Sequence, residues 1–185
     1  MSRRFAILDR DGTINEEVGY VLHPAEMHLI PGSAEAIHRL RELGLGVIVV
    51  TNQSPIGRGL LTEQRLGDIH DRLRDLLADG GATVDEIEFC PHTPEDGCGC
   101  RKPGTEMVER AARLLDFDPS EAFVIGDHAA DMRLGRALGA TTILVLTGHG
   151  AEECEGAAPL ADHVADDLLG ASRVIESLLA AGDGA

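Results

Sequence analysis

Aromatic residues are scarce in this sequence, and tryptophan is absent. One tyrosine and four phenylalanines occur among 185 residues, whereas apolar residues of all kinds make up 43% of the chain. The core must therefore be built mainly from valine, leucine, isoleucine and alanine. The length suits a single domain that buries a substantial core, and we expect one domain over residues 1–185.

Long hydrophobic runs are also absent. No stretch reaches the roughly 18 apolar residues that suggest a transmembrane helix, so no membrane-spanning segment is expected. The N-terminal sequence MSRRFAILDRDG has basic residues and a short apolar run, but charges interrupt the run and no small-residue cleavage site follows. It does not fit a signal peptide. We therefore expect a cytoplasmic protein whose four cysteines stay reduced.

Basic residues are outnumbered by acidic ones. The chain has 32 acidic and 16 basic residues, which gives a formal net charge of −16. Such a surface repels the phosphates of nucleic acids and of anionic membranes, so neither is expected as a partner. A small anionic ligand would also be repelled unless a few basic groups converge locally.

Apolar runs rich in β-branched residues alternate with amphipathic stretches along the chain. This alternation is typical of an α/β fold with a parallel sheet and helices on both faces. The expected strands are residues 5–8, 46–50, 87–89, 122–125 and 142–146. The expected helices begin at Ser33, Thr62, Thr105, Asp131 and Asp167, and Gly44 and Gly139 end the first and the fourth. Residues 181–185, rich in glycine and alanine, are expected to be a frayed tail.

Polar residues follow four consecutive predicted strands. The four strand ends read LDRDGT, VVTNQS, EFCPH and VIGDHAAD. In open α/β sheets, ligands bind beyond the carboxyl ends of the strands. Aspartate, asparagine and threonine are also ordinary turn residues. This can explain a single polar strand end, but it explains four such strand ends together poorly. The pattern therefore favours a functional site at this edge of the sheet.

Asp9 and Asp11 lie two residues apart at the end of the first predicted strand, where their side chains can point into one space. Gly12 allows the chain to turn sharply after the strand, which leaves the carboxylates of Asp9 and Asp11 exposed. Two carboxylates in one site repel each other, which favours a shared proton or a divalent cation. Asp127, after the fourth strand, could add a third carboxylate, and such an oxygen site suits Mg²⁺.

Four short motifs in this order resemble those of the haloacid dehalogenase (HAD) superfamily of phosphohydrolases. They are DRDGT at residues 9–13, Thr51 after an apolar strand, Lys102, and GD at residues 126–127 followed by Asp131. The match in order and spacing covers residues 5–146. The resemblance implies a Rossmann-like (HAD-like) parallel sheet and a Mg²⁺-dependent phosphatase.

The resemblance also implies a role for each motif residue. Asp9 would attack phosphorus and form an aspartyl-phosphate. Asp11 would protonate the leaving alkoxide and then take a proton from the hydrolytic water. Thr51 would hydrogen-bond a phosphoryl oxygen, while Lys102 would neutralise charge there and orient Asp9.

A magnesium ion and an open site are implied as well. The ligands of the ion would be Asp9, Asp127 and the backbone carbonyl of Asp11. Asp131 would orient Lys102 or the metal shell. Predicted helices and strands already fill the intervals between the motifs, so none can hold a cap domain. Loops at residues 15–30 and 54–61 and the cysteine-containing loop would then select the substrate.

Three of the four cysteines lie in the stretch CPHTPEDGCGCRKP, residues 90–103. With one histidine they offer a ligand set that suits tetrahedral Zn²⁺, namely Cys90, His92, Cys98 and Cys100. Reduced cysteines in a surface loop are the plainer alternative, but cysteine is usually buried and seldom clusters in exposed turns. A disulfide is disfavoured in a cytoplasmic chain. Four protein ligands would leave the ion no open position, so a bound zinc ion would be structural.

The same loop indicates one branch of the superfamily. The pattern C-x-H…C-x-C-R-K-P, with LDRDGTIN and VVTNQSPIGRG, resembles the cap-less branch that contains heptose bisphosphate and histidinol-phosphate phosphatases. The implied substrate contacts are Asp9, Arg10, Asp11, Glu17, Val18, Gly19, Tyr20, Thr51, Asn52, Gln53, Ser54, Arg101, Lys102 and His128. Arg101 would read the distal part of the substrate, such as a second phosphate, because a guanidinium fork suits that group.

Two positions depart from that branch. Pro55 stands where the branch usually has glycine, and His128 stands where many heptose phosphatases have lysine. A histidine there could still donate a hydrogen bond but would carry less charge near neutral pH, which affects the choice of substrate more than the chemistry.

Arg58 is a weaker candidate contact, and Cys154 has no assigned role. The histidines expected to be structural or solvated are His23, His28, His38, His70, His149 and His163.

The resemblance implies a phosphomonoesterase that acts on a small phosphorylated sugar, and we expect a monomer. The 7-phosphate of D-glycero-D-manno-heptose 1,7-bisphosphate is the first choice of substrate, and histidinol phosphate is the alternative. A non-enzymatic phospho-acceptor, similar to a receiver-type signalling domain, is the alternative from another class. Such domains also combine aspartates with a lysine, but they need neither Asp11 as acid and base nor a zinc loop.

Overall fold

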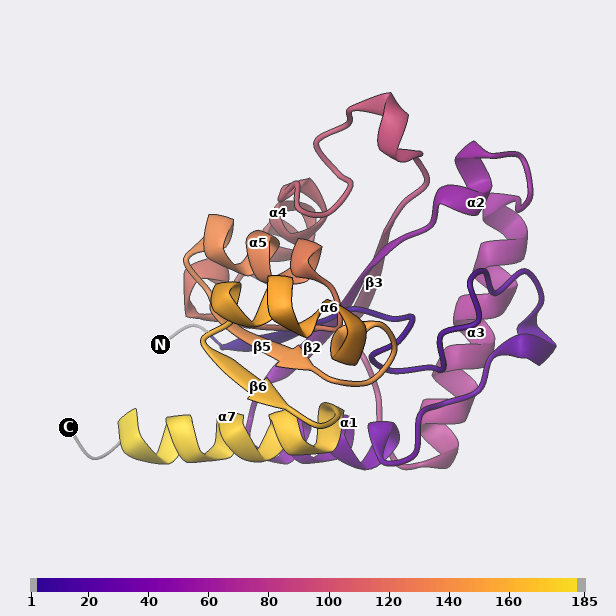
Figure 1. Cartoon of the computed structure of the whole chain (residues 1–185). Helices are drawn as coiled ribbons and strands as arrows, with labels where there is room; N and C mark the ends of the chain where they lie inside the picture. The colour runs from indigo at the N-terminus through magenta and orange to yellow at the C-terminus, as the bar shows by residue number, and fades with distance from the viewer. Residues whose placement is uncertain (1–2, 183–185) are drawn as a thin grey trace.

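The computed structural model describes residues 3–182, and over this range the chain forms a six-stranded sheet in the order β3-β2-β1-β4-β5-β6, parallel throughout (Figure 1). The strands are β1 Phe5–Leu8, β2 Gly46–Asn52, β3 Glu86–Cys90, β4 Phe123–Gly126, β5 Thr141–Val145 and β6 His163–Ala165. The helices are α1 Ser33–Glu42, α2 Ser54–Gly57, α3 Glu63–Asp79, α4 Glu106–Leu115, α5 Ala129–Leu138, α6 Gly150–Ala157 and α7 Leu168–Gly182. The predicted Rossmann-like fold class is confirmed.

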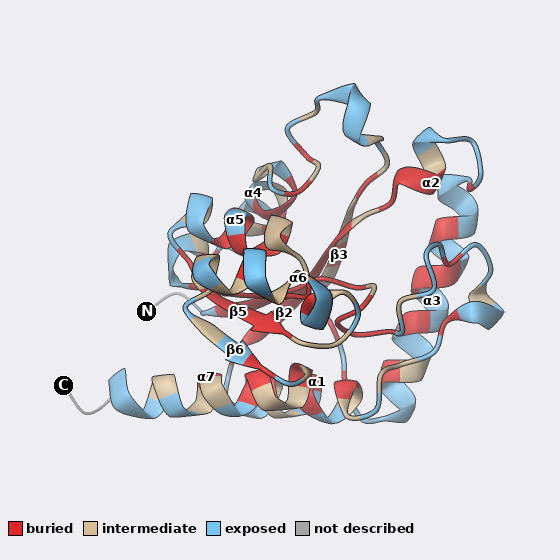
Figure 2. Ribbon diagram, in the orientation of Figure 1, coloured by how far each residue is buried: buried red, intermediate tan, exposed pale blue. Residues whose placement is uncertain are grey.

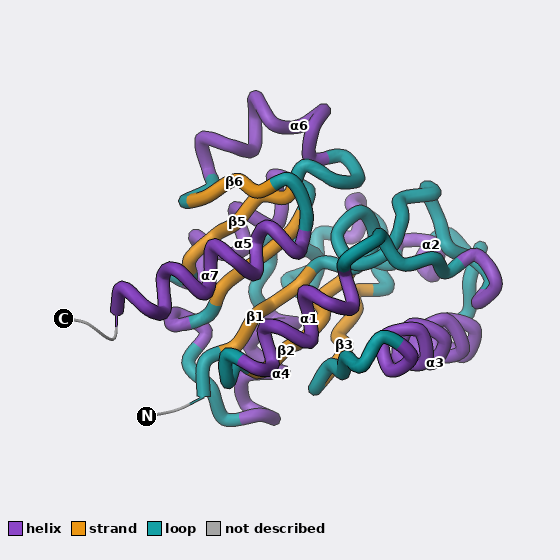
Figure 3. The backbone as a smooth tube through the Cα atoms, turned by 90° about the horizontal axis from the view of Figure 1, so that it is seen from below, coloured by secondary structure: helices purple, strands orange, loops and turns teal. Residues whose placement is uncertain are grey.

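Helices cover both faces of the sheet. α1 and α7 pack on one face with α3 beside them, while α4 and α5 pack on the other (Figures 1 and 3). Successive residues of β1 alternate between the two cores, because Ala6 and Leu8 join the first whereas Phe5 and Ile7 join the second. Figure 2 shows the buried residues concentrated along the strands and the adjoining helix faces. Since both faces are covered, the central strands β1, β2 and β4 appear in the sequence as nearly continuous apolar runs.

The helix N-termini agree with the predictions in part. The hydroxyl of Thr62 accepts a hydrogen bond from the Arg65 amide at 3.1 Å and caps α3, as predicted. Ser33, predicted as a cap, is instead the first residue of α1, and the cap position is Gly32 with a φ of 88°. Glycine adopts this positive φ without the clash that a Cβ would cause.

Three elements of the structure were not predicted, namely α2, α6 and β6. β6 has three residues, and α6 reads GAEECEGA, which contains no apolar stripe of helical period. α7 continues through residues 181 and 182, which were assigned to the frayed tail, and residues 183–185 lie outside the described residues. Among the helices of residues 3–182, none combines the length and the apolar character needed to cross a membrane.

β1 lies at the centre of the sheet, and the strand order reverses there. From β1 the chain moves outward through β2 and β3, then returns to the other side of β1 with β4 and continues to β5 and β6. Parallel pairing aligns Leu8 with Val49 and with Ile125, so the residues that follow these strands meet at one edge. Such a reversal opens a crevice beyond the carboxyl ends of the central strands.

Candidate active site

A pocket of about 490 Å³ opens at this carboxyl edge. Most of the predicted substrate contacts line it: Asp9, Asp11, Glu17, Gly19, Tyr20, Thr51, Asn52, Gln53, Ser54, Arg101, Lys102 and His128. Two do not, because Val18 is 51% exposed to solvent and Arg10 is fully buried beneath the site. The walls also include Val21, Pro55, Arg58, Pro94, Ala130, Asp131 and His149.

Lys102 is buried between two carboxylates. Its Nζ lies 2.7 Å from Asp9 Oδ1 and 2.7 Å from Asp131 Oδ1, and its side chain is 3% exposed. Burial alone would lower the pKa of Lys102, but the charges of Asp131 and Asp9 outweigh burial and raise the pKa above its usual value. Lys102 is therefore a fixed cation that Asp131 orients toward Asp9.

Asp9 follows β1 directly and is almost fully buried. Its Oδ1 accepts a hydrogen bond from the Arg10 amide at 2.7 Å in addition to the Lys102 contact, whereas Oδ2 bonds to no described residue. Burial and the charges of Asp131 and Asp127 raise the pKa of Asp9 well above its usual value, although Lys102 opposes this effect. Further positive charge near Asp9 would favour its ionised form.

Asp127 supplies the third carboxylate of a group that fits a divalent cation. Its Oδ2 accepts a hydrogen bond from the His149 amide at 2.8 Å, whereas the buried Oδ1 has no partner among the described residues. Oxygens of Asp9, Asp127 and Asp131 lie within 4.8 Å of one another. A Cβ on Gly12 would lie 2.2 Å from Asp127 Oδ2, so only glycine allows this approach. An unpartnered carboxylate oxygen beside two further carboxylates suits Mg²⁺.

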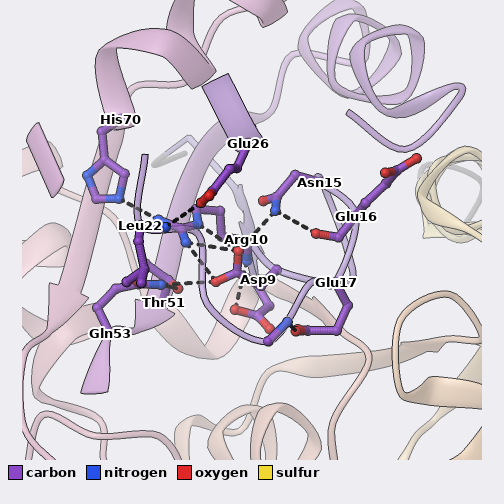
Figure 4. A network of polar contacts seen from close by, with 12 residues as sticks. Asp9, Arg10, Asn15, Glu16, Glu17, Leu22, Glu26, Thr51, Gln53 and His70 are labelled. Carbon is purple, nitrogen blue, oxygen red and sulfur yellow. Dashed lines mark hydrogen bonds and ion pairs between the residues drawn. The ribbon is translucent and has the colours of Figure 1, made fainter. Parts of the chain in front are cut away.

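Asp11 lies in a network of hydrogen bonds that includes Arg10, Asn15 and Gln53 (Figure 4). Arg10 Nη2 donates to both carboxylate oxygens at 2.9 and 2.8 Å, while Asn15 and Gln53 donate at 2.9 and 3.0 Å. Burial would raise the pKa of Asp11, but the charge of Arg10 and these hydrogen bonds together lower it below its usual value. The structure therefore holds Asp11 as a carboxylate.

His70 is a part of the site that the sequence prediction missed. Its Nε2 lies 3.2 Å from Nη1 of Arg10, so the imidazole accepts a hydrogen bond from the guanidinium (Figure 4). Burial and the charge of Arg10 lower the pKa of His70 to about 3, and the ring is neutral. The available signal was its place on α3, four residues after Leu66 and within the stripe that packs on the sheet.

Residues at the end of β2 hydrogen-bond to Asp11, Thr51 and Lys102. Gln53 Nε2 donates to Thr51 Oγ1 at 2.8 Å as well as to Asp11, which leaves the Thr51 hydroxyl hydrogen free for a ligand. Asn52 accepts a hydrogen bond from the Lys102 amide at 3.0 Å. This contact ties the loop that carries Lys102 to the sheet.

The four predicted zinc ligands converge after β3. The sulfur of Cys100 lies 3.1 Å from that of Cys90, 3.4 Å from that of Cys98 and 3.2 Å from Nδ1 of His92. The cysteines are free rather than disulfide-bonded. Zn–S bonds of about 2.3 Å with tetrahedral angles place sulfurs about 3.8 Å apart, and the cluster is close to that spacing. Three sulfurs and one imidazole nitrogen at these separations fit a tetrahedral Zn²⁺.

Comparison with protein families gives a match to an HAD-hydrolase-like family over residues 99–171. The chain is 39% identical over 178 residues to the D-glycero-β-D-manno-heptose-1,7-bisphosphate 7-phosphatase of Bordetella bronchiseptica, covering 95% of this chain and 98% of that one. It is 41% identical to the protein of the same name from Pseudomonas aeruginosa, covering 91% of this chain and 95% of that one.

Solved structures agree with these relatives. The heptose bisphosphate phosphatase of B. bronchiseptica, complexed with magnesium and phosphate, superimposes with a TM-score of 0.87 at 37% identity, covering 94% of this chain and 98% of that one. The corresponding phosphatase from Burkholderia thailandensis gives a TM-score of 0.70 at 32% identity, covering 95% and 99%. The chain belongs to the family of HAD-like phosphatases that includes the D-glycero-D-manno-heptose-1,7-bisphosphate 7-phosphatases.

Proposed function

We propose that this protein removes the 7-phosphate of D-glycero-D-manno-heptose 1,7-bisphosphate in a Mg²⁺-dependent reaction. The observation that carries the proposal is the placement of Asp9 between the fixed ammonium of Lys102 and the unpartnered oxygen of Asp127. Relatives that cover nearly the whole chain at about 40% identity carry the name of this activity, which supports the choice of substrate.

Asp9 acts as the nucleophile in this proposal. Lys102 binds its Oδ1, while Oδ2 is free of hydrogen bonds to described residues and can attack phosphorus. The attack forms an aspartyl-phosphate and releases the sugar alkoxide. Thr51 donates its free hydroxyl hydrogen to a phosphoryl oxygen, and Lys102 offsets the charge that develops there.

Asp11 moves the protons. It protonates the leaving alkoxide, and its carboxylate then takes a proton from the water that hydrolyses the aspartyl-phosphate. The contacts with Arg10, Asn15 and Gln53 lower the pKa of Asp11, and this favours the ionised form required in the second step. The proton that Asp11 takes from water in the second step is the one that it donates to the alkoxide of the next substrate, so the protons balance over each cycle.

The magnesium ligands in this proposal are Asp9, Asp127 and the backbone carbonyl of Asp11. Mg²⁺ bound there supplies positive charge that stabilises the phosphoryl group during transfer. The raised pKa of Asp9 and the unpartnered oxygen of Asp127 support this assignment, because both carboxylates lack sufficient positive charge without a cation.

A structural zinc ion is proposed for Cys90, His92, Cys98 and Cys100. These residues supply four ligands, so the ion has no position for water or substrate. Arg101 follows the last ligand, and its Nη1 donates a hydrogen bond to the His92 carbonyl at 3.2 Å. The zinc loop thereby fixes Arg101 and Lys102 at the pocket, where Arg101 can bind the second phosphate of the substrate.

Phosphate release from several substrates tests the proposal. We expect heptose 1,7-bisphosphate to give the highest kcat/KM with Mg²⁺, above histidinol phosphate and hexose bisphosphates, and Asp9→Asn to abolish turnover. Faster turnover of histidinol phosphate would replace the proposed substrate by the alternative one. Formation of one equivalent of stable phosphoprotein without further turnover would instead indicate a phospho-acceptor.

A further inference from the structure

His70 is a buried polar side chain on the face of α3 that packs on the sheet. The other buried residues of that face include Leu66, Ile69 and Leu73. The ring of Phe89 in β3 packs edge to face on the imidazole, with ring centroids 6.2 Å apart. His70 does not line the active-site pocket, so its ring can influence a substrate only through another side chain.

The polar contact of this ring is with Arg10. Nε2 of His70 lies 3.2 Å from Nη1 of the fully buried guanidinium (Figure 4). A guanidinium only donates hydrogen bonds, so Nε2 is the acceptor. Among the residues that the structure describes, Nη1 has no other hydrogen-bond partner. Without His70 its hydrogens would be buried and unsatisfied, which destabilises the guanidinium in this orientation.

The other nitrogens of the same guanidinium hold Asp11. Nη2 donates to both carboxylate oxygens at 2.9 and 2.8 Å, and Nε donates to Oδ1 at 3.1 Å. The backbone carbonyl of Arg10 is held as well, because it accepts hydrogen bonds from the amides of Ile14 and Asn15 at 2.8 and 3.1 Å. A guanidinium is planar and rigid, so its three nitrogens move together. The position of Nη1 therefore determines where the donors to Asp11 lie.

We propose that His70 is a positioning residue that holds the guanidinium of Arg10 in the orientation in which it binds both carboxylate oxygens of Asp11. The inference rests on the proposed function, because Asp11 transfers the protons in that mechanism. Asn15 and Gln53 also donate to Asp11, but hydrogen bonds from a charged guanidinium are about twice as strong as those from neutral amides. Without the acceptor on Nη1 the guanidinium turns, and the carboxylate of Asp11 is held less firmly at the pocket.

His70→Leu tests this assignment in the full chain loaded with Mg²⁺. Leucine fills the space but accepts no hydrogen bond, whereas the side-chain oxygen of the glutamine in His70→Gln can replace Nε2 as the acceptor. His70→Phe, which keeps a ring without an acceptor, serves the same comparison if His70→Leu does not fold. Leu77→Ala is the matched control, because Leu77 is fully buried on the same face of α3 and lies outside the active-site pocket.

Two substrates separate the placement of Asp11 from a general loss of structure. The alkoxide of heptose 1,7-bisphosphate needs a proton in order to leave, whereas p-nitrophenolate leaves as a stable anion. We expect His70→Leu to lower kcat for the heptose about tenfold to a hundredfold with an unchanged KM, because a part of the general acid–base catalysis is lost. For p-nitrophenyl phosphate, kcat/KM covers only the steps up to release of the leaving group and should change little. His70→Gln should restore most of the kcat for the heptose, and Leu77→Ala should retain it.

Several results would overturn the proposal. They are a wild-type kcat in His70→Leu, an equal loss of kcat/KM for both substrates, the same loss in Leu77→Ala, and no recovery in His70→Gln. If the wild type does not hydrolyse the heptose at all, the proposed function fails. Crystal structures of the wild type and of His70→Leu still decide the positioning role, because a turned guanidinium of Arg10 supports it and an unchanged contact with Asp11 refutes it.

Discussion

Lys102 forms ion pairs with Asp9 and Asp131 while almost fully buried, so replacing this one side chain tests both its proposed role in catalysis and its part in folding. We expect Lys102→Met to lower kcat by a factor of about 10²–10³, because a charge that stabilises the transferring phosphoryl group is lost. The substitution also leaves two buried carboxylates without a cation, which costs about 3–5 kcal/mol of unfolding free energy. Phosphate release and urea unfolding measure the two effects.

The double variant Lys102→Met, Asp131→Asn is the control for that prediction. It removes one of the two unpaired carboxylates, so it should recover part of the stability and none of the activity. A wild-type kcat in Lys102→Met would contradict the role of Lys102 at the phosphoryl group.

Acid stability should depend on His70. The pKa of this buried ring is about 3 in the folded protein, whereas a histidine exposed to water has a pKa of 6.5. Below pH 6.5 the unfolded chain binds the additional proton, so the contribution of His70 to stability is complete above pH 6.5 and decreases as the pH falls toward 3. The loss for this group amounts to about 2 kcal/mol at pH 5.

His70→Gln, which keeps an acceptor for Arg10, should remove this part of the pH dependence. Urea unfolding at pH 5 and pH 8 measures it in the wild type and in the variant. An equal loss of stability in both proteins on acidification would show that other groups cause it.

The acidic residues and the lysine of the site could be predicted because each lies within a short motif at a strand end. The contact between Arg10 and His70 could not, because the two residues are 60 positions apart in the chain and meet only after α3 packs on the sheet. Residues that act through another side chain leave little trace in local sequence.

The loop at residues 90–103 acts as one element that joins the cysteine cluster to Lys102. We expect purified protein to contain one zinc ion per chain, and we expect Cys98→Ser to lower zinc content, the unfolding midpoint and kcat together. We expect kcat to fall because Arg101 and Lys102 lose their fixed position, although neither Asp9 nor Asp127 is altered. Metal analysis, thermal unfolding and phosphate release measure the three quantities.

Cys154→Ser is the matched control for the loop, because Cys154 packs beside α5 and β5, outside the zinc cluster. This variant should retain zinc and activity. Wild-type protein purified without chelators that contains no zinc would disprove the proposed structural ion.

In residues 3–182, β1, β2, β4 and β5 were predicted because they lie inside the sheet, which requires an apolar run, whereas the edge strand β3 was predicted only over residues 87–89 of its sequence EIEFC. β6 and α6 lie at the far edge of the sheet, where fewer side chains need to be buried. Their sequences are correspondingly short or polar. Prediction therefore succeeded in the centre of the sheet and failed at its β6 edge.

For the whole molecule, the site draws on residues from both halves of the sheet, since Thr51 and Lys102 lie on one side of β1 and Asp127 on the other. We therefore expect activity and helical circular dichroism to disappear in one cooperative urea transition with the same midpoint. Loss of activity at a clearly lower urea concentration would show that the substrate loops unfold separately from the sheet.

The central position of β1 has a consequence for the biogenesis of the protein. β1 and Asp9 leave the ribosome before β2 and β3, yet β4 and Asp127, which complete the other side of β1, are translated after all of these. Until then one side of β1 has no partner strand, and the carboxylate of Asp127, proposed as a magnesium ligand, is missing from the site. The nascent chain thus carries Asp9, the proposed nucleophile, early, but the carboxylate group around it is complete only after most of the sheet has been synthesised.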